Sequence, residues 1–468
     1  MMNKWKNTVC YGLGAFGHDA FYGILNTYLL MFVTSLMFAQ GSHHYVTRMV
    51  AIVTMILMVI RIIELVLDPF IGSLIDKTDS KWGKYRPWIF GTGLVIGIGS
   101  PFLFTTMGGM STSNGGLFLV LFTILFLVLY LVYAFKDISF WGLLPSMSLN
   151  SNDRGFTATG ARIGSTLGAN FITVVYAALV TFFSGSKHFT EHGWFMFVLV
   201  VGLIELVGAC FTAFGTKEKK SVVTAQNAKK ITFKQVFKTL ASNDQLLWMS
   251  LSYIIYCLGI TTMNNLLIYY FRYVLNAQSS WALIGWVGIA TGLISIISYP
   301  TLAKHFGRRK IMVGAFCVEL IAFLIFSFTK SVAMTLFAQV LYTLANPLVF
   351  MVLILTIADC VEYGQWKTGH RSEAATSAVR PMLDKFSGAV STGLIGIIAG
   401  MAGMTGNTTA ASISTHDIFV FKTFCFYIPF FCILIGMIIF IAKVKLDEKM
   451  HKDIVQKLAH DIKSNDDK

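Results

Sequence analysis

The chain has 468 residues, of which 55% are hydrophobic and only 13% are charged, and its mean hydropathy is +0.67. A soluble protein of this length would carry roughly a quarter charged residues, so the composition excludes a soluble globular protein and predicts a polytopic membrane protein. The formal net charge of +14 does not indicate a nucleic-acid partner, because the basic residues lie in short loops between apolar spans.

Apolar windows predict an all-α chain with twelve transmembrane helices. The predicted spans cover residues 9–37, 47–75, 88–107, 116–144, 156–184, 192–214, 246–272, 280–303, 311–329, 332–358, 373–402 and 418–442. Lysine and arginine concentrate in every second loop, which places both termini in the cytoplasm. The first span carries Asp19 and lacks a small-residue cleavage site, so we expect no cleavable signal peptide. The seven cysteines fall in spans or at their edges, which predicts free thiols.

The longest polar break divides the twelve spans into two sets of six. The loop after the second span ends in GKYR (83–86), and a shorter counterpart, GRRK (307–310), follows the eighth span. Charged loops at matching positions in two halves are typical of a duplicated transporter whose site lies between the halves. We expect an N-terminal six-helix bundle (1–215), a cytoplasmic middle loop (216–245), a C-terminal six-helix bundle (246–442) and a charged cytoplasmic tail (443–468) that forms a solvated, fraying amphipathic helix.

Three charged residues share one face of the second span. Arg61, Glu64 and Asp68 occur at i, i+3 and i+7. Carboxylates at this depth are costly unless they face a cavity, a partner or an ion, so they predict a functional role. Attraction to Arg61 and mutual repulsion oppose each other, so the pair can exchange a proton or hold a small cation. Leu67 and Ala134 offer no side-chain oxygen for a sodium cage, which favours a proton.

A second polar group spans the first and fourth helices. Asp19 lies in the middle of the first span, where the alternative to ligand contact is an internal ion pair. Tyr133, Asp137 and Trp141 are spaced four apart and form one stripe of hydroxyl, carboxylate and indole. A carboxylate that accepts from vicinal hydroxyls, beside a ring against the apolar face of a pyranose, is a sugar-binding arrangement. The alternative for this stripe is an aromatic core.

The fifth and eleventh spans also carry charged residues. Arg162 can donate a bidentate pair of hydrogen bonds, and substrate contact and structural pairing are equally open for it. Lys385, with Asp384 and Arg380 near it, is the one lysine deep in the C-terminal half. It is placed to face the carboxylates of the N-terminal half across a central cavity.

Three further charged residues fall inside apolar spans. Lys136 points about a hundred degrees away from the stripe of the fourth span, so we expect it to pair elsewhere or to snorkel. Glu205 and Glu319 have no polar neighbours in the sequence, and we expect both to be structural or interfacial.

Four stretches carry a resemblance to a known family. They are the first span with Asp19, RIIELVLDPFIGSLIDKTDSKWGKYRPW (61–88), KDISFWGLLPSMSLNSNDRG (136–155) followed by Arg162, and ADCVEYGQWKTGHRSEA (358–374) leading to Lys385. On these stretches the sequence resembles the glycoside–pentoside–hexuronide:cation symporters. This branch of the major facilitator superfamily contains melibiose permease and the lactose/galactoside permeases of Gram-positive bacteria. The resemblance implies the major facilitator fold of two six-helix bundles.

The resemblance also implies roles for particular residues. Sugar binding is implied for Asp19, Tyr133, Asp137, Trp141 and Arg162, with Phe350 at the position of an aromatic ring in the C-terminal half. Glu64 and Asp68, beside Arg61, are implied to form the cation site, and Lys385 to link the two sites and contact the sugar. A cytoplasmic gate that latches the halves is implied for Asp76, Lys84, Arg86, Asp359, Glu362 and Arg371.

The sequence departs from melibiose permease at several of these positions. His18 replaces a lysine that contacts the sugar, which leaves the role of His18 in substrate binding open. Glu64 replaces an aspartate, and Leu67 and Ala134 replace polar residues near the sodium site. The arrangement of Glu64 and Asp68 is similar to that of the lactose permeases of Gram-positive bacteria, which couple to protons. Some of those permeases carry a C-terminal phosphotransferase-like domain, and regulation by phosphotransferase proteins is left open for this chain.

We therefore expect a proton-coupled symporter or exchanger of glycosides, such as lactose or raffinose-type galactosides, in a bacterial cytoplasmic membrane. Rocker-switch alternating access would be its mechanism, with no cofactor, metal or catalytic residue. The alternatives are a pentoside, glucuronide or sodium-coupled symporter of the same family, a sugar sensor, and a lysolipid transporter, which would need a lateral apolar opening. A glycosidase is disfavoured because Glu64 and Asp68 lie on one helix and cannot flank a glycosidic bond.

Overall fold

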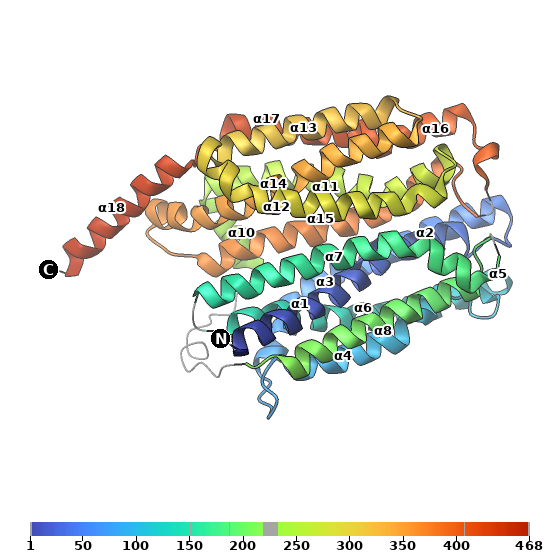
Figure 1. Cartoon of the computed structure of the whole chain (residues 1–468), viewed down its shortest axis with the longest axis horizontal. Coiled ribbons are helices and arrows are strands. Elements are labelled where there is room, and N and C mark those ends of the chain that lie inside the picture. The colour runs from blue at the N-terminus through green and yellow to red at the C-terminus, as the bar shows by residue number, and fades with distance from the viewer. Residues whose placement is uncertain (1, 149–150, 187, 219–232, 407, 467–468) are drawn as a thin grey trace. The chain divides into compact units, whose positions relative to one another are not determined.

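The computed structural model describes residues 2–148, 151–186, 188–218, 233–406 and 408–466. Helices make up the regular structure of these ranges (Figure 1). Eleven helices within the described residues are long and apolar enough to cross a membrane. A further set, α1 (Met2–Gly23), η1 (Ile24–Tyr28) and α2 (Leu29–Ser35), continues without a break at the position of the first predicted span. The all-α prediction is confirmed, and the helices are consistent with twelve spans.

The remaining helices follow the predicted spans in order. In the first part of the chain they are α3 (His43–Asp76), α4 (Arg86–Gly99), η2 (Ser100–Phe104), α5 (Met110–Ser113), α6 (Gly115–Ser146), α7 (Ser151–Ser184) and α8 (Glu191–Gly215). In the second part they are α10 (Phe233–Ser242), α11 (Asp244–Tyr269), η3 (Tyr270–Val274), η4 (Gln278–Ser280), α12 (Trp281–Phe306), α13 (Arg308–Phe328), α14 (Val332–Thr368), α15 (Glu373–Met401), η5 (Ala410–Ser412), α16 (Thr415–Lys422), η6 (Thr423–Tyr427), α17 (Ile428–Lys443) and α18 (Glu448–Asp466). All seven cysteines are free thiols.

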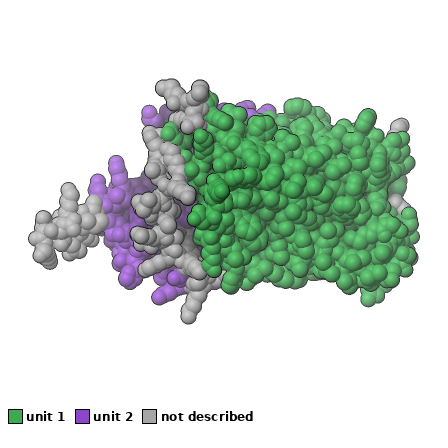
Figure 2. Space-filling model, turned by 90° about the horizontal axis from the view of Figure 1, so that it is seen from below, with its two compact units in different colours: residues 1–230, 265–289, 389–421 green, residues 231–264, 290–388, 422–468 purple. Residues whose placement is uncertain are grey.

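The chain divides into two compact units (Figure 2). Unit 1 contains residues 1–230, 265–289 and 389–421, and unit 2 contains residues 231–264, 290–388 and 422–468. These units are defined by contacts within the folded chain, and the domain boundaries expected from the sequence remain a prediction. Residues 219–232 of the predicted middle loop lie outside the described residues.

In unit 1, α1 packs against α7 and α8, while α4 packs against α6 and α8. Small residues permit the approach of α7 to α1. A Cβ atom on Gly164 would lie 2.1 Å from the carbonyl oxygen of Gly12, and one on Gly168 would lie 2.1 Å from that of Phe16. Close backbone contact between small residues is a usual basis of helix association in membranes. It fixes α1, which carries His18 and Asp19, against its neighbours.

Unit 1 also contains helix ends from the second half of the sequence. The hydroxyls of Thr34 and Tyr269 are 2.7 Å apart, and the backbone N–H of Gly406 donates to the Thr34 carbonyl at 2.7 Å. The indole N–H of Trp281 donates to the Tyr28 hydroxyl at 3.2 Å. These bonds join segments of both predicted halves at the helix ends that we predicted to be extracellular.

In unit 2, α13 packs against α14 and α17, and α18 contacts α14. Large apolar side chains of unit 2 remain exposed, such as Ile297 of α12 at 75% and Phe328 of α13 at 75%. Side chains of this kind suit contact with lipid tails. The protein is therefore an integral, multi-pass membrane protein.

Candidate functional site

The predicted coupling residues lie on α3, which begins after the N-cap Ser42 and runs for 34 residues. Arg61 and Glu64 are both buried, and Asp68 lies one turn beyond Glu64. The Arg61 guanidinium donates to Asn26 Oδ1 at 2.6 Å and to the Leu25 carbonyl at 2.9 Å. Both acceptors belong to η1, a π-helical turn of a kind that often marks functional sites. Arg61 therefore ties the predicted coupling helix to the first span.

The sequence analysis did not identify Asn26 as a partner of the coupling helix. Its signal was a carboxamide in the middle of a predicted span, since polar side chains at this depth are rarely without a role. A second element holds the same arginine, because the Arg61 guanidinium lies 5.5 Å from the centre of the Tyr130 ring on α6. Three helical elements thus meet at Arg61.

Leu67 and Ala134, which offer no side-chain oxygen, lie in one apolar cluster. Ala134 belongs to a buried cluster with Ile71 and Ile75, and Leu67 packs against this cluster. The described residues contain no group of three or more His, Cys, Asp or Glu side chains that could hold a metal ion. The assignment of Glu64 and Asp68 to a cation site remains a prediction.

The stripe on α6 gathers around His18 of α1. The His18 side chain is buried, with Nε2 3.1 Å from Asp137 Oδ1 and 3.3 Å from the Tyr133 hydroxyl. Its ring stacks on Tyr133 and on Phe140, with centroids 5.4 and 5.0 Å apart, and meets the edge of Trp141. His18 thus contacts the Asp137 carboxylate from the buried part of this group.

Exposure differs between the two ends of this group. His18 and Tyr133 are 2% and 5% exposed, whereas the side chain of Asp137 is 25% exposed and Trp141 is 39% exposed. A buried layer of aromatic rings and histidine therefore lies beneath a carboxylate and an indole that are partly exposed. This separation argues against the alternative that the stripe is a closed aromatic core.

Two further predicted sugar-binding residues are Asp19, which follows His18 on α1, and Arg162 of α7. Asp19 is half-buried, and within the described part of the chain it forms no hydrogen bond or ion pair. Arg162 is exposed although it lies inside α7. An intramembrane carboxylate without an internal ion pair favours the predicted ligand contact for Asp19, which remains a prediction.

Lys136 pairs with Glu205 of α8, and both side chains are fully buried, at 1% and 0% exposure. This contact confirms the first of the two expectations for Lys136, which was pairing away from the stripe. Glu205 has no polar neighbour in the sequence, and its partner comes from another helix, in agreement with the structural role expected for it. Lys136 lies on α6 next to Asp137 in sequence, but it faces α8.

In unit 2, a separate polar group surrounds Asp384 on α15. Asp384 accepts a hydrogen bond from the Tyr253 hydroxyl and pairs with Arg380 at 2.8 Å. The Arg380 guanidinium also lies 5.0 Å from the centre of the Phe350 ring. Phe350, predicted as a sugar-facing ring, therefore carries a cation on its face. Lys385 follows Asp384 in this unit, and its predicted link to the carboxylates of unit 1 remains a prediction.

The predicted gate residues of unit 1 form contacts around the start of α4. Asp76 pairs with Lys84, and the Glu218 carboxylate accepts from the backbone N–H groups of Lys84, Tyr85 and Arg86 at 2.7 to 3.0 Å. An anion at these groups stabilises the helix N-terminus. Partial burial opposes the charge of Lys84, but Asp76 outweighs it and raises the pKa of Lys84.

The predicted gate residues of unit 2 pair with one another and with the tail helix. Glu362 pairs with Arg371 at 3.0 Å, and Asp359 pairs with Arg308 at 2.7 Å. Glu448 of α18 accepts from the backbone N–H of Arg308 at 2.6 Å and approaches its guanidinium at 3.3 Å. The first turn of α18 is therefore anchored at gate charges, and the predicted latch between the halves remains a prediction.

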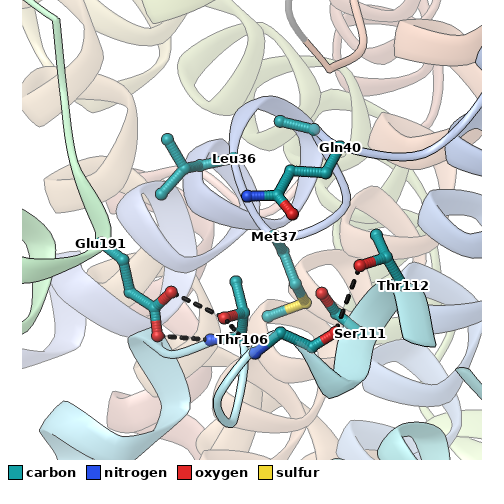
Figure 3. Close-up of a pocket in the computed structure, with 9 residues that line it drawn as sticks. Leu36, Met37, Gln40, Thr106, Ser111, Thr112 and Glu191 are labelled. Atoms are coloured by element: carbon teal, nitrogen blue, oxygen red, sulfur yellow. Dashed lines mark hydrogen bonds between the residues drawn. The ribbon is translucent and has the colours of Figure 1, made fainter. Parts of the chain in front are cut away.

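A pocket of about 290 Å³ opens where α2 ends, beside α5 and the start of α8 (Figure 3). Its lining includes Met37, Gln40, Ser111 and Glu191. The Glu191 carboxylate accepts from the backbone N–H and hydroxyl of Thr106 at 2.7 and 2.6 Å. The lining contains none of the predicted site residues, so this pocket is not our candidate sugar site.

Comparison with known proteins gives a consistent picture. Residues 10–448 match the family model described as MFS/sugar transport protein. The chain is 42% identical over 462 residues to the lactose permease of Lactobacillus delbrueckii subsp. bulgaricus, covering 98% of this chain and 73% of that protein. It is 39% identical over 459 residues to the raffinose carrier protein of Pediococcus pentosaceus, covering 97% and 72%.

Solved structures support the fold. The crystal structure of a bacterial homologue of the iron transporter ferroportin in its inward-facing state aligns with a TM-score of 0.62 at 16% identity, covering 95% of this chain and 99% of that one. At this identity the likeness concerns the fold alone. The chain therefore belongs to the MFS/sugar transport protein family, in its glycoside–pentoside–hexuronide symporter branch.

Proposed function

We propose that this protein imports galactosides, such as lactose or raffinose-type sugars, together with protons across a bacterial cytoplasmic membrane, and that it also exchanges sugars. The observation that carries the proposal is the α6 stripe, in which Asp137 and Trp141 remain accessible above buried His18 and Tyr133. The carboxylate would accept hydrogen bonds from sugar hydroxyls, and the indole would cover the apolar face of the ring.

The choice of a galactoside is supported by relatives. Proteins 42% and 39% identical to this chain are a lactose permease and a raffinose carrier protein, and both match over nearly its full length. The accessible carboxylate and the unpaired Asp19 suit a polyhydroxylated ligand better than a lipid. We therefore favour a sugar transporter over a lysolipid transporter or an enzyme.

The choice of a proton is supported by the surroundings of α3. Glu64 is buried, and Leu67 packs on the apolar cluster that contains Ala134. A sodium site would need several oxygen ligands, whereas a carboxyl group binds a proton alone. Proton and sugar would be coupled because both favour the same occluded state, and this differential affinity links the two binding events. The occluded protein would then open to one membrane face or the other by the rocker-switch mechanism.

Transport into proteoliposomes tests the proposal. We expect labelled lactose to accumulate under an imposed proton gradient and to be displaced by unlabelled galactosides. Accumulation driven only by a sodium gradient would overturn proton coupling, and competition only by xylosides or glucuronides would overturn the substrate.

The variant Asp68→Asn separates the coupling site from the sugar site. We expect it to lose uphill accumulation while it retains exchange of sugar across the membrane. Unchanged accumulation would contradict the role of Asp68.

A further inference from the structure

Glu319 lies halfway along the membrane-spanning helix α13 and is 0% exposed. The proposed sugar and coupling sites do not use it, and it belongs to unit 2, whereas Glu64 and Asp68 belong to unit 1. A carboxyl group at this depth calls for a physical explanation, because burial of an ionised carboxylate is costly unless a cation compensates it.

The contacts of Glu319 are made by neutral groups. Its Oε1 accepts a hydrogen bond from the Tyr256 hydroxyl at 2.7 Å, and that hydroxyl in turn accepts from the amide of Asn346 at 2.8 Å. Its Oε2 is buried and has no hydrogen-bond partner in the part of the chain that the structure describes. The carboxyl group is therefore held through one oxygen.

The helices around Glu319 supply no positive charge. From α11 it faces Tyr256, and from α14 it faces Asn346 and Tyr342, whose hydroxyl is engaged by Asn264 at 2.9 Å. From α17, Phe440 packs on Phe316 of α13. Within the described residues no lysine, arginine or histidine lies within ion-pair distance of Glu319.

This geometry suits a carboxylic acid. The carbonyl oxygen of a protonated carboxyl group accepts one hydrogen bond, here from Tyr256, while the other oxygen carries the proton. We infer that Glu319 binds a proton in this conformation and forms a second proton-binding site, separate from Glu64 and Asp68. The inference goes beyond the proposed function and holds whichever ion drives sugar transport.

Infrared spectroscopy of the purified full chain tests the inference directly. We expect the carbonyl stretch of a protonated carboxylic acid at neutral pH, with a shift in D₂O. Glu319→Gln should remove the component of this band that Glu319 contributes. The matched control is the double variant Lys136→Met/Glu205→Leu, because Glu205 is equally buried but is paired with Lys136, and removal of the whole pair should leave the band in place. Loss of ionised carboxylate bands instead of the acid band in Glu319→Gln would overturn the inference.

A second variant keeps the test decisive should Glu319→Gln fail to fold. Tyr256→Phe removes the donor to Oε1 and leaves the carboxyl group in place. We expect the acid band to persist and to move to higher frequency, because the carbonyl loses a hydrogen bond. An acid band that is absent in both the native protein and Tyr256→Phe, or one that does not move, would overturn the assignment to Glu319.

Discussion

Two glutamates in transmembrane helices of this protein are fully buried, and they are neutralised in different ways. Glu205 of α8 pairs with Lys136 of α6, so two opposite charges are buried together. Glu319 of α13 accepts from Tyr256 and has no basic partner among the described residues. Unit 1 therefore buries a pair of opposite charges, and we infer that unit 2 buries a neutral carboxylic acid.

This difference predicts how each of the two buried glutamates responds to substitution. Removing one member of a buried ion pair leaves an uncompensated charge, which costs far more than the pair contributes. A buried neutral acid can be replaced by an amide of the same shape with little change, because no charge is exposed to an apolar environment. Substitutions at the two glutamates should therefore diverge.

The largest expected effect is on the ion pair. Lys136→Met should destabilise the protein by about 3–5 kcal/mol, because Glu205 would be buried without its partner. Thermal unfolding in detergent would measure this loss. The double variant Lys136→Met/Glu205→Leu should recover most of it, and Glu319→Gln should cost about 1 kcal/mol or less. Equal losses in Lys136→Met and Glu319→Gln would break the comparison.

Asp19 extends the comparison to a carboxylate that is only half-buried and forms no ion pair within the described residues. Asp19→Asn should weaken sugar binding by roughly 10- to 100-fold, since a hydrogen bond to a charged group contributes about 1.5–3 kcal/mol. Its thermal stability should stay near that of the native protein, unlike that of Lys136→Met. Calorimetric titration with lactose would measure affinity, with Asp417→Asn as a control outside the predicted sites. Native affinity in Asp19→Asn would remove Asp19 from the sugar site.

His18 contacts the Asp137 carboxylate through a single ring nitrogen, so the effect of its replacement should be smaller. His18→Phe keeps the stacking on Tyr133 and Phe140 but removes the contact of Nε2 with Asp137. We expect sugar affinity to fall by about fivefold, which corresponds to roughly 1 kcal/mol for one hydrogen bond. The same titration would measure it, and an unchanged affinity would show that Asp137 is oriented by other groups.

Much of the fold could be predicted from the sequence. Only helices with internally satisfied backbone groups cross a bilayer as single segments, so hydropathy alone locates them. The stripe of Tyr133, Asp137 and Trp141 could be predicted as well, because residues spaced four apart share a helix face. Both inferences depend on spacing within one segment.

The partners of these residues could not be predicted in the same way. His18 meets Asp137 across 119 residues, and Arg61 meets Asn26 across 35. Contacts between helices depend on which faces pack together, and helical periodicity carries no information about that choice. For the same reason, the sequence does not reveal that Glu205 pairs with Lys136.

The smallest expected effect concerns the tail helix, where a surface carboxylate provides the solvent-exposed counterpart of the two buried glutamates. Partial burial would raise the pKa of Glu448, but the backbone N–H and guanidinium of Arg308 outweigh burial and lower this pKa. A lowered carboxyl pKa means that the contact is fully present above the ordinary value of 4.5 and weakens as the pH falls through the lowered value.

Glu448→Gln should therefore loosen the first turn of α18 at neutral pH, with little effect on overall stability because exposed ion pairs contribute little. Limited proteolysis after α17 would detect the loosening, and native protein should show it only under acid conditions. Equal protection of Glu448→Gln and native protein at neutral pH would show that α18 is held by its other contacts, such as the approach of His451 to Asp359.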